Sequence, residues 1–94
     1  MIYELEFEER ALKEFQKISE VLKAQFKKKL AEVLIEPHIP AHCLRGMRDC
    51  YKIKLRPSGY RLVYQVVDAQ IVVLVLAVGK RERSDVYQTA KQRL

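Results

Sequence analysis

Three stretches of the chain alternate hydrophobic and polar residues, which is the two-residue period of half-buried β-strands. The first is IYELEF, residues 2–7, the second is YKIKLR, residues 51–56, and the third is YRLVYQVV, residues 60–67. Residues 71–79 then form an uncharged and mostly apolar run. Because such a run has no polar face, it predicts a strand at the centre of the sheet.

Residues 8–35 change to the longer period of amphipathic helices. The apolar positions predict a short helix with Leu12, Phe15 and Ile18, and a longer one with Leu22, Phe26, Leu30, Val33 and Leu34. Ser19 between them is a suitable N-cap. We expect the two helices to form a hairpin over one face of the sheet. Pro37 and Pro40 end the second helix, and residues 36–50 are expected to form a loop.

The strands around RPSGY, residues 56–60, are predicted to form a hairpin, with Gly59 where a positive φ is needed. Their apolar positions coincide in one register: Leu62 near Ile53 and Tyr64 near Tyr51. That register places Arg61 on the same face as Lys52 and Lys54, whereas a slip of one residue would mix charges with the core.

VVDAQIVV, residues 66–73, predicts a second hairpin, and Ser84 with Asp85 can cap a final helix that holds Val86, Tyr87 and Ala90. The fold class is therefore α+β. We expect one domain, residues 1–94, with a small antiparallel sheet, the helical hairpin on one face and a short C-terminal helix. A domain of this size has a thin core.

The chain carries a net charge of +6, and its positive excess lies in two segments. Residues 45–61 hold six Lys and Arg against one acid, and residues 80–94 hold five against two. Such concentration is typical of a surface that binds phosphates. The acidic N-terminus is unlike a signal peptide, and no apolar run approaches the ~20 residues of a membrane span, so we expect a cytoplasmic protein without membrane contact.

The side chains suited to a phosphodiester are Lys52, Lys54, Arg61, Arg81 and Tyr87. Cleavage of RNA by its own 2′-hydroxyl needs a proton acceptor, a proton donor and cations. No histidine or carboxylate pair is placed for proton transfer, and tyrosine (pKa ~10) and arginine (above ~12) exchange protons poorly at neutral pH. Such a site should act weakly on free RNA. Another body that held the RNA in line for attack could contribute roughly 7–11 kcal/mol.

The segments RALKEF, CLRGMRDCYKIKLRPSGYRLVYQV and VGKRERSDVY together resemble the RelE family of bacterial toxin–antitoxin toxins, over essentially the whole chain. The resemblance implies a fold like that of microbial ribonucleases and a ribosome-dependent endoribonuclease that cuts mRNA in the A site of the 70S ribosome, beside 16S rRNA. It implies no metal or cofactor. It also implies a RelB-like antitoxin, with the complex binding operator DNA and repressing its own operon.

The resemblance also implies a role for each matching residue. Lys52 and Lys54 would orient the phosphate and help activate the 2′-hydroxyl, and Arg61 would stabilise the transition state. Arg81 would be the acid at the leaving group, and Tyr87 would stack on a base or act as the base. The other candidates for RNA contact are Arg45, Arg48, Arg56, Lys80 and Arg83. An antitoxin could silence the enzyme by displacing Tyr87 with the last helix.

Two other functions stay open. A ParE-like toxin has a similar fold but poisons gyrase and lacks the nuclease residues. A basic module could instead bind nucleic acid or a partner without catalysis, in which case Arg81→Ala would lower affinity and leave no chemical step to lose.

Several other features have a functional and a structural interpretation, and we favour the structural one in each case. His38, His42, Cys43 and Cys50 could hold a metal or form a Cys–His pair, but their spacing matches no strong zinc pattern. A disulfide is not expected in the cytoplasm. Tyr51, Tyr60 and Tyr64 could stack on bases, but the phase of the strands places at least Tyr51 and Tyr64 in the core. The lysines at 23 and 27–29 are expected to form a solvated helix face, and Arg83 a local ion pair.

Overall fold

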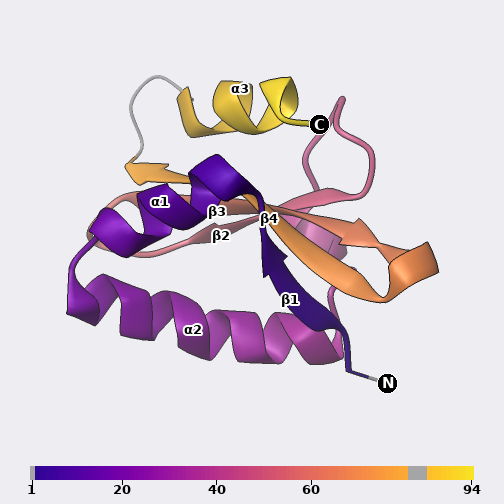
Figure 1. Cartoon of the computed structure of the whole chain (residues 1–94), viewed down its shortest axis with the longest axis horizontal. Helices are drawn as coiled ribbons and strands as arrows, with labels where there is room; N and C mark the ends of the chain where they lie inside the picture. The colour runs from indigo at the N-terminus through magenta and orange to yellow at the C-terminus, as the bar shows by residue number, and fades with distance from the viewer. Residues whose placement is uncertain (1, 81–84) are drawn as a thin grey trace.

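One mixed sheet lies between two helical layers (Figure 1). The computed structural model describes residues 2–80 and 85–94. The elements are β1 (Glu4–Phe7), α1 (Glu9–Lys17), α2 (Glu20–Ile35), the 3-10 turn η1 (Pro40–His42), β2 (Cys50–Lys54), β3 (Tyr60–Val67), the 3-10 turn η2 (Asp68–Gln70), β4 (Val72–Lys80) and α3 (Asp85–Gln92). The predicted α+β class is confirmed.

The order of the strands is β1-β4-β3-β2, so the apolar strand β4 lies inside the sheet as predicted. β2, β3 and β4 are antiparallel neighbours, but β1 runs parallel to β4. The expectation of an antiparallel sheet was therefore incomplete. Alternation marks a strand but not its direction, which depends on the connection; a long crossover such as residues 8–71 is what parallel neighbours require.

The predicted register of the β2–β3 hairpin is confirmed residue by residue. Ile53 lies opposite Leu62, Tyr51 opposite Tyr64, and Lys54 opposite Arg61. Gly59 has a φ of +80° in the turn between the strands, a conformation that other residues rarely adopt. The turn residue chosen from the sequence thus allows the pairing that aligns the apolar side chains.

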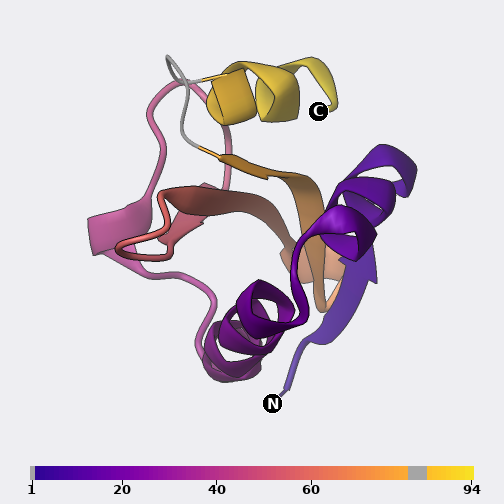
Figure 2. The same ribbon diagram turned by 90° about the vertical axis from the view of Figure 1, so that its left-hand side faces the viewer.

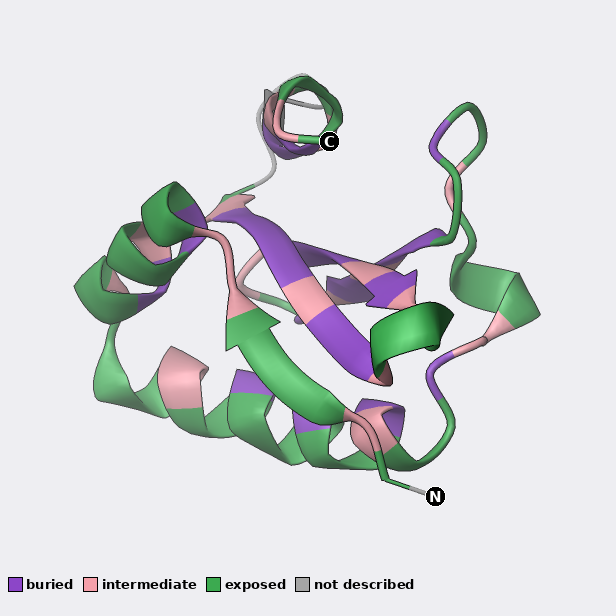
Figure 3. Ribbon diagram, turned by 45° about the vertical axis from the view of Figure 1, so that its right-hand side comes forward, coloured by how far each residue is buried: buried purple, intermediate pink, exposed green. Residues whose placement is uncertain are grey.

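The sheet has a separate apolar core on each face. The larger core lies under α1 and α2, which Figure 2 shows on one side of the sheet, and includes Phe15, Phe26 and Leu30. The smaller core lies under α3 and includes Val86 and Ala90. β4 is buried along most of its length because both layers cover it (Figure 3). The helical hairpin covers one face as predicted, and the C-terminal helix covers the opposite one.

Side chains cap the first two helices. The Glu8 carboxylate accepts hydrogen bonds from the backbone N–H groups of Arg10 (2.6 Å) and Ala11 (3.0 Å). Ser19 Oγ accepts from the N–H of Leu22 at 3.3 Å, as predicted for the N-cap of α2. The proposed cap of the last helix at Ser84 lies outside the described residues. Within residues 2–80 and 85–94, no helix combines the length and the apolarity needed to cross a membrane.

Candidate active site

The β2–β3 hairpin gathers three cations on the sheet face that α3 partly covers. Lys54 lies opposite Arg61, and Lys52 lies two residues earlier on the same strand and points to the same face. All three side chains are partly exposed, whereas Ile53 between the lysines is buried in the opposite core. The cationic cluster predicted from the register therefore forms.

Helix α3 brings Tyr87 to this cluster. Val86 and Ala90 are buried against the sheet, and Tyr87, adjacent to Val86, lies over the basic face. Arg61 Nη1 donates a hydrogen bond to the Tyr87 hydroxyl oxygen at 2.6 Å. The guanidinium carbon of Arg61 also lies 5.5 Å from the centroid of the Tyr87 ring, in cation–π range. Residues 26 positions apart in sequence are thus joined at one site.

The cations of the cluster repel one another. The charge of Lys52, followed by that of Arg61, lowers the pKa of Lys54 below its ordinary 10.5. In the part of the chain that the structure describes, no carboxylate forms an ion pair with Lys52, Lys54 or Arg61. A bound phosphate would relieve this repulsion.

Two further RNA-contact candidates lie at the same end of the hairpin. Lys80, the last residue of β4, is exposed and pairs with Tyr60, next to the Arg61–Gly79 pair. Arg56 is exposed just beyond β2. Arg81 and Arg83, the remaining candidates of this segment, lie outside the described residues, so their predicted positions stay predictions.

The other two candidates lie elsewhere. Arg45 and Arg48 belong to the loop before β2, which begins at the opposite end of the strand from Lys54. Both are exposed, and Arg48 Nε lies 3.8 Å from the Asp49 carboxylate. The structure therefore does not bring Arg45 and Arg48 into the cluster with Arg61, and any contact they make with RNA is distant from it.

A groove of ≈ 650 Å³ continues from the cluster along β2 toward α2. Lys52, Lys54 and Arg56 line one side of the groove, and Lys29, Glu32 and Glu36 line the other, so that side carries both signs of charge. Lys29 was interpreted from the sequence as part of a solvated helix face. Its place beside the hairpin depends on how α2 lies along β2, and helical periodicity carries no information about that packing.

Local hydrogen bonds occupy His38. Its Nδ1 lies 2.9 Å from the Tyr51 hydroxyl and its Nε2 lies 3.0 Å from Asp68 Oδ1, which also accepts a hydrogen bond from the Tyr3 hydroxyl. This network ties the loop after α2 to the residue before β1, to β2 and to the turn before β4. No sequence pattern indicated it, because its members are spread over residues 3–68.

The other members of the suggested metal site are dispersed. Cys50 is buried, Cys43 is exposed, and both are free thiols. His42 lines the groove beside β2. Across residues 2–80 and 85–94, no three His, Cys, Asp or Glu side chains come together in a way that could hold a metal ion.

The tyrosines of the hairpin pack as predicted. Tyr51 and Tyr64 are buried and stack with ring centroids 5.5 Å apart. Tyr64 also donates a hydrogen bond to the Pro37 carbonyl at 2.9 Å. Tyr60 is partly buried against the same core. Among the described residues that face the cationic cluster, Tyr87 is the aromatic side chain available to a ligand.

Comparison with known proteins identifies relatives along the whole chain. Residues 5–85 match the family described as ParE toxin of the type II toxin–antitoxin system parDE. The chain is 62% identical to the mRNA interferase toxin RelE of Escherichia coli strain K12, over 100% of this chain and 99% of the relative. It is 57% identical to a putative RelE-like toxin protein of Escherichia coli, again over 100% and 99%.

Solved structures show the same fold. A doubly mutated form of E. coli toxin RelE in the free state superposes with a TM-score of 0.93 at 60% identity, covering 100% of this chain and 99% of that one. The structure of the intact E. coli RelBE toxin–antitoxin complex matches with a TM-score of 0.83 at 63% identity, over 86% of this chain and 99% of that one.

Proposed function

The chain belongs to the RelE family of toxins from type II toxin–antitoxin systems, and we propose that it is a ribosome-dependent endoribonuclease that cleaves mRNA in the A site. The observation that carries the proposal is the site itself. Lys52, Lys54 and Arg61 share one face of the hairpin, and Tyr87 is hydrogen-bonded to Arg61. The family model describes ParE toxins, but the identity of 62% over the full chain is to an mRNA interferase.

The reaction is an internal transesterification. The 2′-oxygen of the RNA attacks the adjacent phosphorus as its proton leaves, the bond from phosphorus to the 5′-oxygen breaks, and that oxygen takes up a proton. The products are a 2′,3′-cyclic phosphate and a 5′-hydroxyl. Negative charge develops on the phosphorus oxygens, and the two lysines and Arg61 supply donors and charge where it forms.

Proton transfer is shared among residues that are individually poor at it. Lys54 would help activate the 2′-hydroxyl, and its cationic neighbours shift its pKa downward, which is the direction that a proton acceptor needs. The Tyr87 oxygen accepts a hydrogen bond from Arg61, so the hydroxyl hydrogen of Tyr87 can be donated to a phosphate oxygen. Alternatively, the Tyr87 ring would stack on a base. Arg81 is assigned to the leaving 5′-oxygen on the resemblance alone.

The site acts on RNA that something else has positioned. Within the described residues, no histidine or carboxylate forms a hydrogen bond or an ion pair with Lys52, Lys54 or Arg61, although His42, Glu32 and Glu36 line the groove beside the two lysines. The groups of the cluster itself accelerate proton transfer only modestly. A ribosome that bends the A-site codon into line would contribute the larger share. The exposed cations Lys80 and Arg56, and Lys29 across the groove, would contact the flanking RNA phosphates, of the message or of 16S rRNA.

The partner that restrains this activity is proposed to be a RelB-like antitoxin. The E. coli relative forms a RelBE complex, and another solved structure holds the mutated toxin with an antitoxin RelBc peptide. Displacement of α3 would separate Tyr87 from Arg61 and open the cluster. Repression of the operon by the complex on operator DNA, and action in the cytoplasm, complete the proposal.

Primer-extension mapping of a defined message on programmed ribosomes tests the function. We expect cuts within the A-site codon with the wild type, and loss of the cuts with Lys52→Ala combined with Lys54→Ala, and with Arg81→Ala. Products should end in a 2′,3′-cyclic phosphate and a 5′-hydroxyl. Lys91→Ala, an exposed cation on α3, is the matched control and should cut normally. Uncut message with every protein would refute the proposal.

The second candidate is a ParE-like gyrase poison, which the description of the matching family favours. A supercoiling assay with purified gyrase separates the two functions. The proposed function predicts normal supercoiling at toxin concentrations that cleave the message completely on ribosomes. Inhibited supercoiling with intact message would establish the alternative.

A further inference from the structure

The edge of β4 loses its strand neighbour halfway along. β1 pairs with β4 only as far as Phe7 opposite Val75, and its last backbone hydrogen bond runs from the Glu8 N–H to the Val75 carbonyl at 2.8 Å. The chain then turns into α1. The backbone of β4 beyond Val75 is buried but has no strand beside it on this edge, and buried backbone groups need partners.

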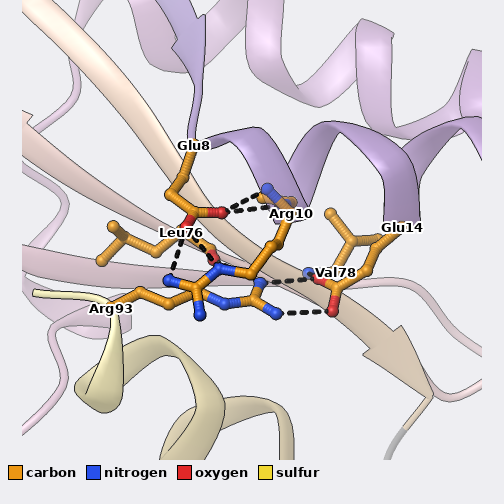
Figure 4. A network of polar contacts seen from close by, with 7 residues as sticks. Glu8, Arg10, Glu14, Leu76, Val78 and Arg93 are labelled. Atoms are coloured by element: carbon orange, nitrogen blue, oxygen red, sulfur yellow. Dashed lines mark hydrogen bonds and ion pairs between the residues drawn. The ribbon is translucent and has the colours of Figure 1, made fainter.

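Two side chains take the place of the missing strand (Figure 4). Arg93 Nη1 donates to the Leu76 carbonyl at 2.9 Å, and Glu14 Oε1 accepts from the Val78 N–H at 3.1 Å. Arg93 and Glu14 also bind each other through two parallel contacts, Nη1 to Oε1 and Nη2 to Oε2, both at 2.9 Å. We call this pair the β4 clamp.

The β4 clamp joins three elements, of which α1 is distant in sequence from the other two. Glu14 belongs to α1, Arg93 directly follows α3, and the backbone they hold is β4. The Arg93 side chain is only 9% exposed, and its positive charge is paired with the carboxylate of Glu14. The hydrogen bond with Glu14 is the main cause that raises the pKa of Arg93. An arginine in this position is poorly placed to bind RNA.

The geometry points to Glu14 and Arg93 as positioning residues for Tyr87, an inference that rests on the proposed function. Helix α3 has eight residues, too few to be stable without tertiary contacts. Val86 and Ala90 hold its inner face, and Arg93 fixes its C-terminal end. Tyr87 lies between these attachment points. A helix held at both ends has one orientation on the sheet, whereas release of Arg93 lets α3 pivot and moves the Tyr87 hydroxyl away from Arg61.

Removing the two opposite charges of the clamp one at a time distinguishes a positioning role from a role in RNA binding. Arg93→Ala lowers the net charge and Glu14→Ala raises it, so a role in RNA attraction predicts opposite changes in affinity for the ribosome. A positioning role predicts the same result for both variants. The cleavage rate at saturating toxin should fall about tenfold or more, and the toxin concentration that gives half the maximal rate should change little. The matched control is Arg10→Ala. Its ion pair with Glu8 lies on the same helix, but its side chain is 63% exposed and holds no backbone of β4.

Rates in a Tyr87→Phe background give the decisive comparison. If the β4 clamp acts through the Tyr87 hydroxyl, Arg93→Ala should slow the wild type about tenfold but slow Tyr87→Phe less than about twofold, because residues that act as a unit are not additive. Equal slowing in both backgrounds would overturn the inference. Glu14→Gln is the milder partner variant, since its side-chain oxygen still accepts from the Val78 N–H while the charge that holds Arg93 is gone.

A readout without RNA distinguishes failure of this inference from failure of the proposed function. In ¹³C-tyrosine NMR spectra the Tyr87 ring signal is assigned by its absence in Tyr87→Phe. It should shift in Arg93→Ala and Glu14→Gln and stay in place in Arg10→Ala, while signals of the buried Tyr64 persist and report an intact core. An unchanged Tyr87 signal in both clamp variants would overturn the positioning role. A shifted Tyr87 signal in the clamp variants, together with a wild type that cuts no message, would support the positioning role of the clamp and refute the proposed ribonuclease activity.

Discussion

Two replacements of Arg61 should distinguish the contribution of its positive charge to catalysis from the contribution of its planar guanidinium, whose parallel N–H donors we call the fork. The Arg61 guanidinium holds the Tyr87 hydroxyl at 2.6 Å and lies against its ring, and it faces the same open surface as Lys54. One donor aimed at the charge that develops in a transition state is worth about 2.7–4 kcal/mol, or 10²–10³ in rate. We therefore expect Arg61→Ala to slow single-turnover cleavage on programmed ribosomes by roughly 10²–10³-fold.

Arg61→Lys keeps the charge, but the three hydrogens of an ammonium diverge from one nitrogen and do not reproduce the planar, parallel donors with which a guanidinium can hold Tyr87 and a phosphate oxygen together. It should recover only part of the rate and remain roughly tenfold or more below the wild type, with near-normal ribosome affinity. Folding should be little affected, because an exposed cation–π contact is worth about 0.5–1 kcal/mol. Lys91→Ala controls for the loss of one exposed positive charge from α3. Full activity of Arg61→Lys would refute the role of the fork, and a loss under threefold in Arg61→Ala would refute the site.

Three other predictions concern stability and charge. Tyr64→Phe removes one of the two hydrogen bonds to the buried Pro37 carbonyl, which still accepts from the Ile39 N–H at 3.1 Å, and should lower the free energy of unfolding in urea by about 0.5–1.5 kcal/mol; an unchanged midpoint would contradict a stabilising hydrogen bond from Tyr64. The hydrogen bond from Tyr3 is the main cause that lowers the pKa of Asp68 from its ordinary 3.8. The ionised carboxylate of Asp68 therefore stabilises the folded protein above pH 3.8, and this stabilisation is lost as the pH falls below that value. Asp68→Asn should thus destabilise the protein at pH 7 and should destabilise it progressively less as the pH falls below 3.8, and a loss that does not change with pH would count against this. Lys54→Ala should reduce the slope of log affinity for a single-stranded RNA against log salt by about 0.7, whereas an unchanged slope would place Lys54 away from phosphates.

The sequence alone was sufficient for the part of the site that depends on strand pairing. Alternation along β2 and β3 allows one register that keeps charge out of the core, and that register determines the neighbourhood of Lys52, Lys54 and Arg61. The last helix was predicted from its apolar spacing, and burial of Val86 turns Tyr87 toward the cluster. These features follow from local periodicity, which is readable without knowledge of tertiary packing.

Features that depend on packing between distant elements were not predictable. Glu14 and Arg93 are 79 positions apart, and both appear in the sequence as ordinary charges on helix surfaces. The reason for their pairing is that β1 stops at Phe7 and leaves backbone of β4 open, which no pattern in either helix reveals. The direction of β1 and the approach of Lys29 to the hairpin were missed for the same reason.

The central claim is that this protein cuts RNA only when another body holds the RNA in line. The most direct test is to compare single-turnover cleavage of one message on programmed ribosomes with cleavage of the same message free in solution, at equal toxin concentration. An assisted ribonuclease predicts a rate on the ribosome that is higher by a factor on the order of 10⁵ or more. Rates within tenfold of each other would contradict the claim. They would show that the residues of this chain catalyse cleavage without help from the ribosome.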